Sequence, residues 1–225
     1  MPDKALELWE EFRTVVVEKN SFFDAVLPPI VFLFLNELVS FQAAMWGALV
    51  LAMLIAGLRV WHKQSLLYAL SGIGSVGLAV AIAFWLGRSE GFFATSLVSG
   101  SMMLLLAVLS LVIRRPMVAW TSYIARRWPI DWYWHPQVRP AYSEVTFVWA
   151  IFFAARLFLQ FSFFQQANTS MLAVTNLLTG WPAIMVLLIL SYLYGSWRLK
   201  NLHGPSVEEF KNNTPPPWKS QQRGF

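Results

Sequence analysis

The sequence contains no cysteine and few charged residues. Among 225 residues, Cys is absent, charged residues make up 13%, and His occurs three times. The absence of Cys excludes disulfides and thiolate metal sites. A soluble domain of this length carries about a quarter charged residues, whereas 57% of this chain is hydrophobic. The imbalance predicts an integral membrane protein.

The few polar groups also limit the chemistry that we expect. The three histidines lie outside the apolar runs, at His62, His135 and His203. An axial haem ligand or an intramembrane catalytic base would have to lie inside such a run. No cluster has the spacing of metal ligands. No carboxylate cluster or nucleophile–base pair is evident. We therefore expect a protein that is not an enzyme and that has no cofactor and no metal.

Two features suggest nucleotides or nucleic acid, and both have a simpler explanation. The stretch "GIGSVG", with Gly72, Gly74 and Gly77, matches the dinucleotide fingerprint but lies inside an apolar run. That fingerprint works only where a strand turns into a helix, so we interpret the small residues as helix packing positions. The net charge is +5. In a membrane protein such an excess records orientation, and we expect no nucleic-acid partner.

The apolar runs predict membrane-spanning helices, each of which needs roughly 20 residues. Candidate spans cover 22–39, 42–58, 66–86, 94–113, 145–164 and 172–195. We expect an all-α integral membrane protein with six transmembrane helices in three hairpins, forming a membrane domain over 21–197. The first two runs are joined by the short polar stretch "NELVSFQ", so one long broken helix is the alternative.

Basic residues suggest how the spans are oriented. Most Lys and Arg residues fall in the tails, at 59–63 and in 114–144, whereas the opposite side carries Arg88 alone. Cytoplasmic loops collect positive charge, so we expect both termini and the 114–144 loop to be cytoplasmic. A five-span arrangement would place one basic tail on the wrong side.

The two ends of the chain lie outside this membrane domain. Residues 1–20 show no secretory signal and place apolar residues, including Trp9 and Phe12, on one helical face. This pattern predicts an amphipathic interfacial helix. The 198–225 tail is polar and proline-rich, and we expect it to be disordered unless it docks on something. We expect Trp9, Phe12, Pro216 and Trp218 to contact partner subunits.

The loop between the fourth and fifth spans contains "RRWPIDWYWHPQVRPAYSE". Aromatic rings favour the headgroup level of a bilayer, and Arg reaches lipid phosphates. Prolines prevent one continuous helix. We therefore predict a lipid interface made of Arg126, Arg127, Trp128, Trp132, Trp134 and Arg139. A partner-docking or catalytic loop is the alternative.

Two ionisable residues lie at membrane depth. Arg156 is about 16 Å into its span and Glu37 about 22 Å into the first, at about 1.5 Å per residue. A buried charge is costly unless it is paired, so we predict a buried polar network of Arg156 and Glu37 with Gln160 and Asn36. The network could be a structural bridge or an ion or substrate path.

The segments "FFDAVLPPIVFLF", "ALSGIGSVGLAVAIAFWLG", "VIRRPMV", "YSEVTFVWAIFFAARLFLQ" and "GWP" occur in this order. Over about residues 20–197 they resemble an uncharacterised bacterial family of polytopic membrane proteins, a domain of unknown function common in actinobacteria. The likeness to the intracellular septation protein A family is more distant. The matching positions are Pro28, Arg115, Pro116, Trp149, Arg156, Gln160, Trp181 and Pro182. The resemblance implies a bacterial inner-membrane location and no established catalysis; the tail departs from the pattern.

These observations leave open three functional hypotheses. The first is a non-catalytic scaffold or accessory subunit of a membrane complex or of envelope machinery, in contact with membrane lipids and other membrane subunits. The second is a small transporter or channel that uses Arg156 and Glu37. The third, a lipid enzyme, has only the basic aromatic loop in its favour.

Overall fold

The computed structural model describes residues 21–222 and 224–225, and all regular secondary structure in this part of the chain is helical. Five helical segments are long and apolar enough to cross a membrane: Phe41–Trp61, Ala69–Leu86, Ser89–Val112, Arg139–Gln165 and Thr169–Asn201. A shorter apolar helix covers Leu27–Leu38. The helices and their composition indicate a membrane-embedded protein, in agreement with the predicted class.

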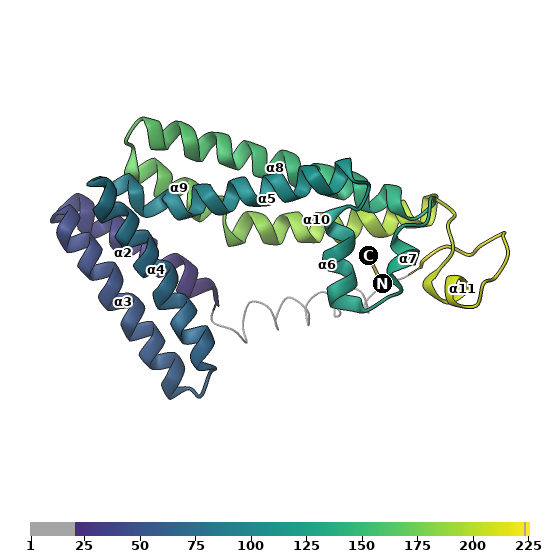
Figure 1. Ribbon diagram of the computed structural model, residues 1–225, viewed down its shortest axis with the longest axis horizontal. Coiled ribbons are helices and arrows are strands. Elements are labelled where there is room, and N and C mark those ends of the chain that lie inside the picture. Colours follow the sequence, from purple (N-terminus) through teal and green to yellow (C-terminus); the bar gives the residue numbers. More distant parts are fainter. Residues whose placement is uncertain (1–20, 223) are drawn as a thin grey trace. The chain divides into compact units, whose positions relative to one another are not determined.

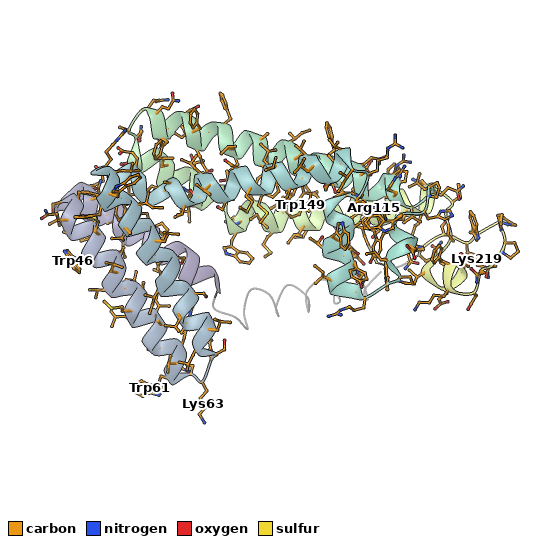
Figure 2. All side chains as sticks on the ribbon, viewed as in Figure 1. Trp46, Trp61, Lys63, Arg115, Trp149 and Lys219 are labelled. Carbon is orange, nitrogen blue, oxygen red and sulfur yellow. The ribbon has the colours of Figure 1, made fainter. Side chains whose placement is uncertain are left out.

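The helices form two compact units, between which the chain passes near residues 96, 159 and 177. The first unit contains α2 (Ser21–Leu38), α3 (Phe41–Trp61), α4 (Leu66–Leu86), the short 3-10 helix η1 (Ser89–Phe93) and most of α9 (Thr169–Leu178). Figure 1 shows α3 and α4 running side by side as a hairpin. Trp46 and Trp61 point outward from α3, as they would toward lipid, and Lys63 lies at the turn (Figure 2).

Small residues let the helices of the first unit approach one another. Ala44, Ala48, Ala52 and Ala56, spaced four apart on α3, are all buried, as expected for packing positions in a membrane bundle. Ser40 begins α3, because its side chain accepts a hydrogen bond from the backbone N of Ala43 at 3.2 Å. Gly72 of "GIGSVG" lies within α4 and faces the end of the Arg59 side chain of α3, since an added Cβ would lie 2.9 Å from its guanidinium.

The second unit contains most of α5 (Ala94–Val112) and α8 (Arg139–Gln165), together with α6 (Met117–Arg126), α7 (Ile130–Tyr133), α10 (Trp181–Asn201) and α11 (Val207–Lys211). Within this unit α5, α8 and α10 run alongside one another (Figure 1). Phe153 of α8 packs with Ala107 of α5. Trp149 of α8 donates from Nε1 to the Ser191 hydroxyl of α10 at 2.8 Å.

Some predicted boundaries are wrong. The span expected over 172–195 lies within the candidate span Thr169–Asn201, but a turn divides it between α9 and α10. Gly180 is the N-cap of α10, and Pro182 lies in its first turn, where a missing N–H costs nothing. The fifth helix starts at Arg139 rather than near 145 for the same reason, since Pro140 lies in its first turn. Helix α2 continues through Pro28 and Pro29.

Candidate functional site

The most elaborate packing outside the candidate spans lies at one end of the second unit. We call residues 113–138, 202–222 and 224–225 the cap. It includes α6, α7 and α11 and covers the C-terminal end of α5, the N-terminal end of α8 and the C-terminal end of α10. Pro116 and Pro129 precede α6 and α7 as their N-cap residues, so the prolines divide this loop into short helices.

A cluster of aromatic rings holds the cap together. Trp132 and Tyr133 are fully buried, and their ring centroids are 5.1 Å apart. Trp128 packs edge-on against Trp132 at 5.3 Å. Tyr142, from the first turn of α8, contacts Tyr133 at 5.1 Å. The rings therefore form a protein core rather than a single lipid-facing row.

This burial corrects part of the predicted lipid interface. Trp132 is 0% exposed, and its Nε1 donates to the carbonyl of Pro205 at 2.8 Å. Its assignment to the lipid headgroups is wrong, because the ring and its N–H are enclosed by the tail of the same chain. Trp128 and Trp134 are half-buried, so for these two rings contact with lipid stays a prediction.

The tail docks on its own chain. Ser206 caps α11 in a reciprocal capping box with Glu209. The Glu209 carboxylate accepts from the backbone N of Ser206 at 2.8 Å and from the backbone N of Lys219 at 2.9 Å. The Lys219 and Ser206 N–H groups lower the pKa of Glu209 below its ordinary value. One carboxylate thus joins α11 to the segment that follows it.

The residues that we expected to bind partners have different positions. Pro216 is exposed, whereas Trp218 is half-buried. The Trp218 ring contacts His135 edge-on at 5.3 Å. Trp9 and Phe12, and the amphipathic helix expected over 1–20, lie outside the described residues. Docking by Pro216 and Trp218 stays a prediction, with Pro216 the more accessible of the two.

The cap carries several arginines. Arg115 stacks over the Trp134 ring with its guanidinium carbon 4.3 Å from the centroid. Arg126 lies over Trp128 at 5.2 Å. Arg114 and Arg127 are exposed and have left-handed backbone φ angles of 57° and 56°. With the half-buried Arg139, they form a basic surface where α5, α6 and α8 begin or end.

An ion pair ties α8 to α10 just below this surface. Arg198 donates from Nε and Nη2 to the two carboxylate oxygens of Glu144 at 2.8 and 2.9 Å. The Tyr194 hydroxyl donates to Glu144 at 2.7 Å. Such two-pronged contacts fix orientation as well as charge, so Glu144 holds the fold at this point.

Burial shifts two titratable groups of the cap toward their neutral forms. Burial raises the pKa of Tyr133, although its hydrogen bond with Ser122 opposes this. Burial also lowers the pKa of His135. Among the described residues, no group of three His, Cys, Asp or Glu side chains could hold a metal ion.

The members of the predicted buried network fall in different places. Glu37 is exposed and accepts from the Ser170 hydroxyl at 2.8 Å. Asn36 is half-buried in the same unit. Arg156 is half-buried in the part of α8 that belongs to the second unit. The pairing of Glu37 with Arg156 stays a prediction.

Gln160 has the most enclosed side chain of this set. It is 0% exposed, and its Nε2 donates to Oδ1 of Asn176 at 2.7 Å. Asn176 in turn donates to the carbonyl of Leu172 at 3.1 Å, which fixes the orientation of both amides. Oε1 of Gln160 is buried and makes no hydrogen bond within the described residues.

Sequence reasoning missed a polar group in the first unit. Glu90 is 6% exposed and pairs with Arg88 at 3.3 Å. Thr169, at the start of α9, shares a 3.0 Å hydrogen bond with Ser89 and lies 3.5 Å from Glu90. The sequence did contain a signal for this group, because Glu90 lies two residues after Arg88, the one basic residue of that loop.

A family model described as a protein of unknown function (DUF3159) matches residues 19–198. The chain belongs to the DUF3159 family. The DUF3159 match includes α2 and ends within α10, so the tail half of the cap lies beyond it. No curated protein and no solved structure matches the chain.

Proposed function

We propose that this DUF3159 member is a non-catalytic membrane scaffold or accessory subunit whose cap binds anionic lipid and a protein partner. The observation that carries the proposal is the cap itself. Two segments distant in sequence interlock through the buried Trp132 and its bond to Pro205. The outcome is a folded basic surface beside apolar helices, and such a surface attracts an anionic leaflet.

The proposal includes an arrangement in the membrane. Helix α2, at about 1.5 Å per residue, is about as long as the hydrocarbon core is thick, so we propose it as the sixth span. Three hairpins then place both termini and the cap on the cytoplasmic side of a bacterial inner membrane. A distant relation to septation protein A, an actinobacterial origin and a role in envelope machinery belong to the same proposal.

Lipid binding can be tested by native mass spectrometry of the full-length chain purified with its lipids. Replacing Arg114, Arg115 and Arg127 with Gln should reduce the number of retained anionic lipids. The triple Lys variant is the matched control, because it keeps the charge and should retain them. Equal retention by the parent and the Gln variant would contradict a lipid-binding cap.

Partner binding needs a separate experiment. A photo-crosslinking residue at the exposed Pro216 should yield one adduct of defined mass in intact membranes, and a crosslinker at the exposed Trp61 should yield lipid adducts. The parent should also run as a complex of fixed stoichiometry in mild detergent. A lone monomer with no adduct from Pro216 would exclude the scaffold role.

One observation supports a small transporter as the second candidate. The buried Oε1 of Gln160 makes no hydrogen bond within the described residues, and the break between α9 and α10 follows shortly after its partner Asn176. Broken helices beside buried polar groups are common in transporters. Ion flux in proteoliposomes that Gln160→Leu abolishes, and that Gln165→Leu at an exposed site does not, would favour this candidate.

A further inference from the structure

The Phe225 ring fills a socket in the second unit. The ring stacks on Tyr142 of α8, with centroids 4.4 Å apart and an interplanar angle of 10°. It also lies against Gly195 of α10, where an added Cβ would overlap the ring. Phe225 is only 8% exposed, although the tail around it is largely polar. The missing side chain at Gly195 therefore provides the space for this ring.

The backbone beside the ring is held by the cap. Arg126 donates from Nε to the backbone oxygen of Phe225 at 3.0 Å. Gly224 has a φ of +83°, and an added Cβ would lie 2.9 Å from Arg126 and from Trp128. A residue with a side chain would be strained there by both its backbone and its neighbours. The socket thus selects a glycine followed by an aromatic residue.

A short segment reaches the socket from an exposed stretch. Residues 211–217 are exposed. We call residues 218–222 and 224–225 the strap. Two bonds tie it to α11, from the backbone N of Lys219 to Glu209 at 2.9 Å and from the backbone N of Val207 to Gln221 at 3.1 Å. Ser220 lies within the strap and is 3% exposed. The strap contacts the rest of the cap through these bonds, through the edge-on contact of Trp218 with His135 and through the socket.

The strap closes over a buried tyrosine. Phe225 covers one face of the Tyr142 ring, and Tyr142 is 0% exposed in this closed state. Opening the strap would uncover that face. The two states would then be in equilibrium, and a ligand that binds the open state would shift it.

We propose that the socket of Gly195, Tyr142, Arg126 and Trp128 is a binding site for a glycine–aromatic peptide segment, which Gly224 and Phe225 occupy in cis as a releasable strap. The open strap offers the same site to a segment of that chemistry in trans. The inference stands independently of whether the chain is a scaffold or a transporter.

The first test measures strap opening in the full-length protein. The chain has no native Cys, so Ser220→Cys provides a single thiol for a water-soluble maleimide. Labelling should be slow in the parent. It should be about tenfold faster or more with Gly195→Ala or Phe225→Ala, because protection follows the opening equilibrium. Gly57→Ala, where an added Cβ meets nothing within 4 Å, should leave the rate unchanged. Equally slow labelling in all variants would overturn the proposal.

The second test measures ligand binding. A dye-labelled peptide of residues 216–225 with an amidated end should bind full-length Phe225→Ala, whose socket is empty, more tightly than the parent. It should not bind the Gly195→Ala, Phe225→Ala double variant, and a peptide ending in Ala should bind none of them. Equal binding to all three proteins would refute a socket.

Folding of the variants is checked by thermal unfolding. If Gly195→Ala unfolds the protein, Arg126→Gln tests the same socket without adding atoms to it. It removes the bond to the Phe225 backbone and should speed labelling of Cys at position 220. An unchanged rate in that variant would count against the socket.

Discussion

At the residue scale, the environment of each aromatic ring decides its role. Trp61 is 84% exposed on α3, whereas Trp132 is fully enclosed by the cap. Both are tryptophans that lie outside the spans predicted from the sequence. The sequence identifies such rings as amphipathic, but whether lipid or protein covers them depends on contacts with distant residues, here Pro205.

Trp132→Phe should therefore destabilise the protein although it keeps an aromatic ring. The change leaves the buried carbonyl of Pro205 without its donor, which costs about 1–2 kcal/mol. Thermal unfolding in detergent should show a lower midpoint. Trp61→Phe is the control and should leave the midpoint nearly unchanged. A midpoint for Trp132→Phe equal to that of the control would show that the bond contributes little.

The Glu209 carboxylate should make the stability of the tail depend on pH. Its pKa is lowered in the folded protein by the N–H groups of Lys219 and Ser206. A group with a lowered folded pKa contributes stability above its ordinary pKa, near 4.5, and loses it as the pH falls through the folded value. Unfolding midpoints measured from pH 6 down to about pH 3 should therefore fall more steeply in the parent than in Glu209→Gln. Glu208→Gln, at the exposed neighbour, should follow the parent.

At the scale of elements, the importance of a glycine depends on how closely a neighbouring helix approaches it. An added Cβ at Gly91 would lie 2.7 Å from the Cα of Ala83, which is backbone of α4. At Gly77, within α4, an added Cβ meets nothing within 4 Å. The first glycine is required by close approach, and the second only adds flexibility to its helix.

Gly91→Ala should lower stability by about 1–3 kcal/mol, because overpacking against a backbone cannot be relieved by a side-chain movement. Gly77→Ala should be neutral or raise stability by about 0.5–1 kcal/mol, because alanine favours helix. Chemical denaturation of the two variants measures the difference. Gly91→Ala as stable as the parent would show that η1 can move away from α4.

The sequence predictions were accurate where they depended on local composition and less accurate where they depended on contacts between distant residues. Apolar runs located the helices well, because membrane insertion depends on local composition. Helix ends were less accurate, since Pro140 and Pro182 begin helices rather than break them. Docking of the tail was left open, but the surface that receives it was missed. That surface depends on Gly195, a single glycine in an apolar helix, which looks like ordinary small-residue packing.

At the scale of the whole molecule, the remaining question is which segments cross the membrane. The distribution of basic residues favours one orientation in the membrane. The cap gathers arginines where α5 and α6 end, whereas the loop at Arg88 pairs its basic residue with Glu90 at 3.3 Å. Basic loops stay in the cytoplasm, so the cap should be cytoplasmic. Whether α2 crosses the membrane then determines the side on which residues 1–20 lie.

Single cysteines at Asn20, Gln42 and Thr214 can test whether α2 spans the bilayer. Gln42 and Thr214 are exposed, and no native Cys interferes. In sealed vesicles of known orientation, an impermeant maleimide should label Cys at 20 and 214 from the cytoplasmic side and Cys at 42 from the other. The expectation rests on the length of α2, because about 20 helical residues are enough to cross the hydrocarbon core. Labelling of positions 20 and 42 from the same side would mean that α2 lies in the interface. Labelling of position 214 from the outside would reverse the orientation of the cap and remove the electrostatic basis for its binding to an anionic cytoplasmic leaflet.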